Sequence, residues 1–298
     1  MNVSGFDIAT RGKFVKVASL EGEKYLYLDN PESMIEALKA SAVRADLFTF
    51  QQRLPESAPK FNYRFEMDNL AVMTVSTFED WWNHQIKSLA RNRSRQAEKR
   101  GVTLRQIPFD EETARGIWEI YNECPMRQGK RFPHYGKSLE EVRKMSATFL
   151  ENSIFLGAFF EGQMIGFAKL VADQTWTQAN LMHILSLVKH KEKAPTNALI
   201  AHSVKACVER GIKYLVYQNF VYGNKKGDGL SNFKEINGFQ RVDVPRYYVP
   251  LTRWGAIALE GRLHIPLANR VPAGVSGAFR EFRTFWYRNK FKSSGEAL

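Results

Sequence analysis

The chain has 298 residues, of which 44% are hydrophobic, so it is long enough to bury the core of one large domain or of two smaller ones. Its apolar runs are far shorter than the roughly 20 residues of a membrane-spanning helix, and residues 1–12 lack the pattern of a secretory signal. These features exclude an integral membrane protein and predict a cytoplasmic one, or one held peripherally at the inner membrane face. The formal net charge of +12 indicates anionic partners such as phosphates, CoA, tRNA or acidic lipids, without choosing among them.

Residues 1–75 are predicted to form a small N-terminal α/β module or extension. The segments 14–17 and 24–28 alternate apolar and polar residues like half-buried strands. A helical pattern begins at Pro31, and two further strands are predicted between 63 and 73.

From residue 76 the predicted elements alternate between helices and strands. They are a helix over 77–100, a strand over 102–107, helices over 111–124 and 138–150, an antiparallel hairpin over 154–171 with its turn at Glu161-Gly162, a strand over 179–187, a helix over 195–210 and a strand over 214–217. This order builds a mixed sheet flanked by helices. The predicted fold class is therefore α/β (α+β), with a mainly antiparallel mixed sheet, the N-terminal module and a basic, aromatic C-terminal tail.

Four stretches between residues 77 and 252 carry a family resemblance. They are the hairpin 155–171, the basic helix end with its Gly-Val at 95–102, the Lys-Ala-Pro helix start at 193–195, and the Phe-Lys and Gly-Phe pairs of 233–239. In this order and spacing they resemble the GNAT fold of acyltransferases, and most closely its FemAB-like branch. The resemblance implies a GNAT-like domain over 76–252.

The resemblance implies an N-acyltransferase that moves an acyl group from acyl-CoA to an amine of a polar small-molecule or peptide acceptor, such as an amino sugar or an amino acid. One departure bears on the donor: the segment 186–195 contains no glycine, whereas GNAT enzymes usually hold the CoA pyrophosphate there with a glycine-bearing loop. FemAB-like enzymes take an aminoacyl group from charged tRNA, so an aminoacyl-tRNA donor is the alternative.

Donor phosphates are expected to bind where this segment enters the next helix, because a helix N-terminus offers free N–H groups and lysines add positive charge. The predicted donor-binding residues are Lys189, His190, Lys193, Thr196, Asn197 and, from the family pattern, Lys234. A solvated basic loop is an equally weighted interpretation of the same residues.

The loop 126–137 combines basic and aromatic side chains with two glycines, a composition suited to gripping a carboxylate, a phosphate or a sugar. The predicted acceptor-binding residues are Arg127, Gln128, Arg131 and Tyr135. The predicted catalytic residues are His134 as the preferred base, His183 as a second base, and Tyr217 as a donor to the acyl carbonyl or the leaving group. No metal site is predicted, because neither Cys124 nor Cys207 has a ligand at metal spacing.

The segment 253–298 is predicted to be a basic amphipathic tail. On a helix, the aromatic residues of 279–286 would share one face, which is typical of a helix at an anionic membrane surface and equally of one docked on its own domain. A third hypothesis follows: a non-catalytic protein that binds nucleic acid or an anionic membrane through the basic segment 87–105 and through 275–298.

Overall fold

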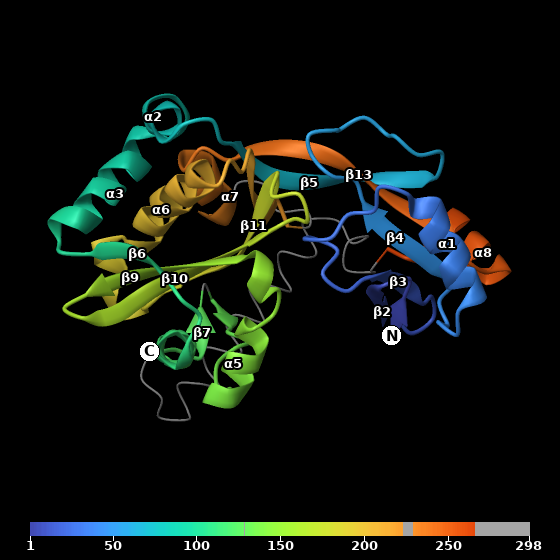
Figure 1. Ribbon diagram of the computed structural model, residues 1–298, viewed down its shortest axis with the longest axis horizontal. Coiled ribbons are helices and arrows are strands. Elements are labelled where there is room, and N and C mark those ends of the chain that lie inside the picture. Colours follow the sequence, from blue (N-terminus) through green and yellow to red (C-terminus); the bar gives the residue numbers. More distant parts are fainter. Residues whose placement is uncertain (128, 223–228, 266–298) are drawn as a thin grey trace.

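The computed structural model of the protein describes residues 1–127, 129–222 and 229–265 (Figure 1). In these residues eleven strands form one large sheet. In spatial order the strands are β1 Asn2–Val3, β2 Phe6–Arg11, β3 Val17–Leu20, β4 Leu47–Gln51, β13 Gln240–Pro250, β5 Arg64–Thr74, β12 Tyr214–Asn219, β11 Gln178–Ser186, β10 Gln163–Ala172, β9 Ser153–Phe160 and β6 Thr103–Ile107. The described neighbours pair antiparallel except for β3 with β4 and β11 with β12. The predicted mainly antiparallel mixed sheet is confirmed.

The long strands β5 and β13 join the two ends of the sheet. They pair from Gln240 with Val72 to Tyr248 with Arg64, while the other edge of β13 pairs with β4 and the other edge of β5 with β12. Strands from the predicted segments 1–75 and 76–252 therefore belong to one continuous sheet.

The helices lie on both faces of this sheet. The described helical segments are α1 Pro31–Ala40, α2 Phe78–Asp80, η1 Trp81–Gln85, α3 Ser88–Lys99, α4 Glu111–Asn122, α5 Leu139–Ser146, η2 Leu150–Asn152, η3 Val188–Lys193, α6 Pro195–Glu209, α7 Gly229–Ile236 and α8 Arg253–Glu260. Two short strands, β7 Met126–Arg127 and β8 Lys130–Arg131, form a ribbon in the loop between α4 and α5.

Side-chain contacts show which helices share a face. Phe167 of β10 packs against Tyr121 of α4, whereas the neighbouring Gly166 lies against Leu199 of α6. Successive residues of a strand point to opposite faces, so α4 and α6 cover opposite sides of the sheet. Figure 1 shows α3, α6 and α7 on one side and α5 on the other.

The central hairpin forms as predicted. β9 and β10 pair antiparallel, and both turn residues have positive φ, 50° at Glu161 and 79° at Gly162, as a two-residue turn of type I′ requires. The predicted helix from Pro31 is α1, and the predicted strand and helix that follow the hairpin are β11 and α6. The buried side chains of β9, β10, β11 and α6 belong to the larger core, whereas those of α1 belong to a second core with β4 and β13.

Four predictions differ from the structure. The two strands predicted between 63 and 73 form one continuous strand, β5. The helix predicted over 77–100 is interrupted at Ile86, where ψ is 135°, because the backbone N–H of Lys87 bonds instead to Ile236 O at the end of α7. The strand predicted over 14–17 begins only at Val17. The segment 24–28 is not a strand. The N–H groups of its first residues turn back to Gly22 O, and its buried tyrosines pack against side chains rather than in a ladder.

Candidate active site

Two parallel strands in the middle of the sheet separate from each other. β11 and β12 pair from Gln178 with Tyr214 to Asn180 with Val216, and the described residues show no pairing between them beyond that point. β11 continues beside β10 as far as Ser186, and its residues 182–186 are partly exposed although the strand is central. Backbone groups on the open edge of a strand can pair with an extended ligand, so this gap is a candidate binding site.

Three side chains from different elements meet on the α4 face beside this gap. His183 lies opposite Lys169 of β10, Tyr121 comes from α4, and His134 comes from the loop after the β7–β8 ribbon. The rings of Tyr121 and His134 stack with centroids 4.5 Å apart, and the rings of His134 and His183 are 5.9 Å apart. Tyr121 Oη is 3.5 Å from His183 Nδ1. The structure thus brings the two predicted bases together and adds Tyr121, which is one of the buried residues of α4.

The surroundings keep both imidazoles uncharged near neutral pH. Burial, with smaller contributions from His134 and Lys169, lowers the pKa of His183 to about 4. Burial and the charge of Lys137 lower the pKa of His134. His134 Nδ1 is buried without a hydrogen-bond partner among the described residues. A neutral imidazole with an unused ring nitrogen can accept a proton from a substrate.

Lys169 places an ammonium group under this cluster. Its side chain is fully buried and donates to the carbonyl of Ser146 at 2.9 Å and to that of Thr148, at the C-terminal end of α5. Burial lowers the pKa of Lys169 to about 8. Lys169 therefore satisfies the last carbonyls of α5 and fixes that helix over the sheet.

Lys169 should make stability depend on pH in a defined direction. Because its pKa falls from 10.5 to about 8 on folding, the unfolded chain binds more protons than the folded chain between these values. The stability of the wild type relative to Lys169→Met should therefore rise as pH rises through this window. Urea unfolding of both proteins at about pH 7 and about pH 10 measures this difference, in which the tyrosine titrations cancel. A difference that stays constant with pH, or shrinks, would contradict the assignment.

The N-terminal segment supplies another cation on the β12 side. The backbone carbonyl of Lys24 accepts a hydrogen bond of 2.6 Å from Asn180 Nδ2, and Lys24 Nζ donates to Gln218 Oε1 at 3.2 Å. Asn180 is the last residue of β11 that pairs with β12, and Gln218 lies near the end of β12, so Lys24 borders the gap. Burial lowers the pKa of Lys24. The sequence offered no signal for this residue, because its position depends on a contact across more than half of the chain.

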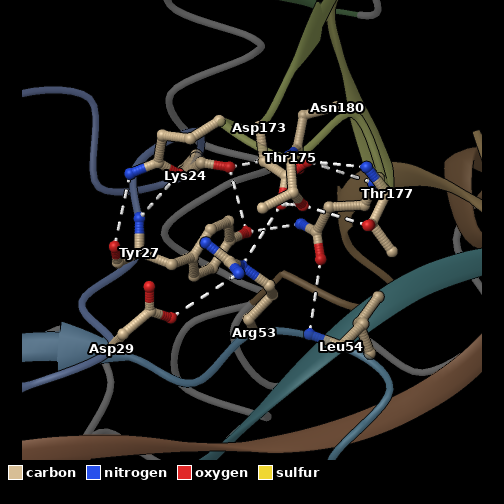
Figure 2. Close-up of polar contacts among 11 residues, drawn as sticks. Lys24, Tyr27, Asp29, Arg53, Leu54, Asp173, Thr175, Thr177 and Asn180 are labelled. Carbon is tan, nitrogen blue, oxygen red and sulfur yellow. Dashed lines mark hydrogen bonds and ion pairs between the residues drawn. The ribbon is translucent and has the colours of Figure 1, made fainter.

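A buried polar network holds this segment in place (Figure 2). Gln178 Nε2 donates to Tyr27 Oη at 2.5 Å, and Gln178 Oε1 accepts from the N–H of Leu54 at 3.3 Å. Asp173, which is fully buried, accepts from the N–H of Thr177 and forms an ion pair of 3.2 Å with Arg53. The network connects the N-terminal residues to the end of the β10–β11 hairpin and so positions Lys24.

The predicted acceptor residues play different parts. Arg127 donates to Ser186 O at 2.8 Å and to Ile120 O at 2.7 Å, so its guanidinium anchors the α4–α5 loop to the end of β11. Arg131 is exposed on β8, and Tyr135 is partly exposed in the same loop as His134. Gln128 lies outside the described residues.

Most of the residues around η3 that were predicted to bind the donor contact other side chains of the protein. Lys193 Nζ lies 3.9 Å from the ring centroid of Phe160, and the ring of His190 is 5.7 Å from the same ring. Lys189 is exposed, with its Nζ 3.5 Å from Gln163 Oε1. Thr196 shares a hydroxyl hydrogen bond with Ser186, and Asn197 donates to Asn237 Oδ1 at 3.2 Å.

A carboxylate occupies the backbone N–H groups of this loop. Glu123, just after α4, accepts from the N–H of Val188 at 2.6 Å and from that of Lys189 at 3.0 Å, and it also contacts Arg127 at 3.3 Å. These are N–H groups that a donor phosphate would need at this position. Sequence reasoning missed Glu123 because the two N–H groups that it binds lie about 65 residues along the chain.

Tyr217 and Lys234 lie apart from the histidines. The ring of Tyr217 packs against Phe239 at 5.7 Å, and Lys234 Nζ is 4.7 Å from its centroid. Lys234, on α7, is fully buried and donates to Asn219 O. Burial raises the pKa of Tyr217, so its hydroxyl stays protonated. These residues approach the end of β12 from the α7 side.

The described residues contain no group of three His, Cys, Asp or Glu side chains that could hold a metal ion. No helix in the same part of the chain is long and apolar enough to cross a membrane.

Comparison with known proteins gives a fold. No family model matches the chain, and no curated protein matches it. Among solved structures, L-PGS from Bacillus licheniformis matches with a TM-score of 0.56 and 17% identity over 86% of this chain and 85% of that one. FemX matches with 0.55 and 10% over 85% and 86%. The C-terminal domain of a protein described as a lysylphosphatidylglycerol synthetase, from Agrobacterium fabrum, matches with 0.55 and 14% over 85% and 83%. The protein therefore shares the fold of FemX and of these synthetases, the GNAT-like fold that its sequence predicts.

Proposed function

We propose that this protein is a transferase that moves an activated acyl group from a carrier to an amine of a polar acceptor. The observation that carries the proposal is the separation of β11 from β12 beside the uncharged pair His134 and His183. The acyl arm of the donor would lie along the open edge of β11, and the acceptor would enter from the α4–α5 loop. An activated ester or thioester needs mainly correct positioning and removal of one proton, which these groups can supply.

The side chains of this site can account for every bond and proton in the proposed transfer. The acceptor nitrogen attacks the acyl carbonyl, a C–N bond forms, and the bond from the carbonyl carbon to the carrier oxygen or sulfur breaks. The imidazole of His134 takes the proton that the nitrogen loses. The leaving group takes a proton from the Tyr121 hydroxyl, which burial keeps protonated and which lies beside His183. The protonated His134, whose ring stacks on that of Tyr121, then returns one proton to Tyr121, so both groups regain their starting states.

For the donor, we favour an aminoacyl-tRNA over acyl-CoA. Glu123 fills the N–H groups of Val188 and Lys189, which disfavours a pyrophosphate at that position. Helix α3, which contacts η3, has a strongly basic exposed side. Its small residues Ala90, Ser94 and Ala97 are buried, and its cations face outward. These exposed cations are Arg93, Arg95 and Lys99. The name of one similar structure, a domain of a lysylphosphatidylglycerol synthetase, supports transfer of an aminoacyl group. Acyl-CoA is the second candidate, favoured by the N-terminus of α6, where Ala194 offers no side-chain cap.

The two donors are distinguished by direct assay. The purified protein is incubated with a mixed pool of radiolabelled aminoacyl-tRNA and, separately, with acetyl-CoA and longer acyl-CoAs, in the presence of pooled amino sugars, amino acids and peptides. We expect loss of label from the tRNA into an acceptor and no turnover of acyl-CoA. If only acyl-CoA is turned over, the donor is acyl-CoA and not aminoacyl-tRNA. RNA or vesicle binding with no transfer from either donor would favour the non-catalytic hypothesis.

The basic face of α3 gives a quantitative prediction. If Arg93 and Lys99 contact tRNA phosphates, the double substitution Arg93→Gln with Lys99→Gln removes two ionic contacts and should reduce the slope of log affinity against log salt by about 2. Filter binding between about 50 and 200 mM salt measures the slope. Arg143→Gln with Lys144→Gln, on α5, is the matched control and should leave the slope unchanged. Equal slopes for the two double variants would place the RNA elsewhere.

A further inference from the structure

Three large apolar side chains are exposed together at the end of the molecule that carries α8. The exposed fractions are 90% for Phe14, 61% for Ile257 and 45% for Trp254. Trp254 Nε1 donates to Phe14 O at 3.1 Å, so the helix and the β2–β3 turn are in direct contact. Figure 1 shows α8 at the opposite end of the molecule from α3 and β6. Phe14, Trp254 and Ile257 are called the Phe14 surface below.

The packing of α8 holds the side chains of this surface towards solvent. Gly255, Ala258 and Leu259 form the buried side of the helix, and the last two pack with Leu47 of β4. A Cβ atom on Gly255 would lie 1.9 Å from Asp46 O, so this side of the helix sits directly on the backbone. The side chains three residues apart, Trp254 and Ile257, are then held on the outer side. The exposure belongs to a fixed arrangement and not to a frayed end.

The charges around the Phe14 surface are mainly positive. Lys13 and Arg253 adjoin its two aromatic residues in the chain, are exposed, and have no ion-pair partner among the described residues. The acidic groups nearby are engaged. Glu260 lies 3.8 Å from a guanidinium nitrogen of Arg64, and Asp46 accepts from the backbone N–H of Lys16. An apolar centre with unpaired cations at its rim complements a surface that is apolar below and anionic above.

We propose that the Phe14 surface docks peripherally on an anionic lipid membrane. Phe14 and Ile257 enter the boundary between headgroups and acyl chains, and the indole of Trp254 lies at headgroup level, where tryptophan is enriched. Lys13 and Arg253 contact lipid phosphates, which stabilises binding to anionic leaflets. Docking places the end of the sheet that carries α8 on the membrane, and the basic face of α3 at the far end remains open to solution (Figure 1). This proposal does not rest on the transferase function.

The test is sedimentation of the full chain with lipid vesicles at low salt. One set of vesicles is phosphatidylcholine alone, and the other is an equimolar mixture of phosphatidylcholine and phosphatidylglycerol. The test variant is Phe14→Glu with Ile257→Glu. The matched control, Leu89→Glu with Val188→Glu, changes the charge equally at two exposed apolar residues of α3 and η3, away from this surface. We expect the wild type and the control to bind the anionic vesicles and not the neutral ones, and the test variant to bind at least about tenfold more weakly, since two apolar side chains no longer leave water.

Two results would overturn the proposal directly: no binding of the wild type to anionic vesicles, or equal binding of the test and control variants. A photoreactive phenylalanine analogue at position 257 tests the other occupants without vesicles. Crosslinks to residues 266–298 of the same chain would show that this chain covers the surface itself. Crosslinked dimers would show that a second copy does. Either result would also reject the membrane proposal.

Discussion

Replacing His134 with alanine is expected to lower kcat/KM for acyl transfer by about 10²- to 10⁴-fold, the range that a positioned general base contributes. His134 Nδ1 has no hydrogen-bond partner among the described residues, so no protein group already engages the imidazole there. The effect should fall mainly on kcat, because the proton is transferred in the transition state. Single-turnover transfer from labelled aminoacyl-tRNA measures it.

The pH profile should show which protonation state is active. The pKa of His134 lies below its ordinary value of 6.5, so the wild type should keep its activity at neutral pH and lose it only as acid protonates the ring. His134→Ala should lose this acid limb. His202→Ala is the matched control, because His202 lies on α6, on the opposite face of the sheet. The activity of this variant should equal that of the wild type. Full activity in His134→Ala would remove the residue from the mechanism.

Replacing Asp173 with alanine is expected to lower the free energy of unfolding by about 3–5 kcal/mol, the cost of breaking a buried ion pair by removing one partner. The substitution leaves Arg53 without its buried carboxylate and the N–H groups of Thr177 and Gln178 without their acceptor. Arg53 Nε lies 3.2 Å from the carboxylate but does not form an aligned hydrogen bond with it. Much of the cost therefore comes from the two backbone N–H groups, which lose their acceptor. Urea unfolding measures the change.

Asp29 provides the control for the same arginine. It contacts Arg53 at 3.6 Å, but its side chain is 89% exposed, so Asp29→Ala should cost at most about 1 kcal/mol. Asp173→Asn keeps an oxygen for the backbone N–H groups and should lie between the two alanine variants. Similar losses for Asp173→Ala and Asp29→Ala would mean that burial does not decide the strength of this ion pair.

Much of the fold could be predicted because its signals are local. The hairpin can be predicted from its two apolar strands and from the Glu161-Gly162 pair between them, where the turn requires positive φ. Helix α5 begins at a capping box of Ser138 and Glu141 that can be read from the sequence. Such patterns depend on a few neighbouring residues and on which side chains avoid water.

The site was predictable only in part. His134 and His183 stood out by residue type, yet their ring contact depends on how the α4–α5 loop folds over β11. Lys24 carried no pattern, and the i,i+4 spacing of Glu123 and Arg127 did not reveal the contacts of Glu123 with backbone N–H groups more than sixty residues away. The segment 24–28 shows the reason most clearly. Its alternation is real, but side-chain hydrogen bonds to the β10–β11 hairpin hold it, and no strand ladder forms.

The order of helices and strands, the GNAT-like fold and the residue types of the candidate site can be inferred from the sequence alone, because they follow from periodicity, turn chemistry, burial of apolar side chains and the family resemblance. Three features required the folded structure: the point where β11 and β12 separate, the histidine that keeps an unused nitrogen, and the binding of Glu123 to backbone N–H groups of η3. These features arise from contacts between segments far apart in the chain, and their strength depends on burial that no local pattern encodes.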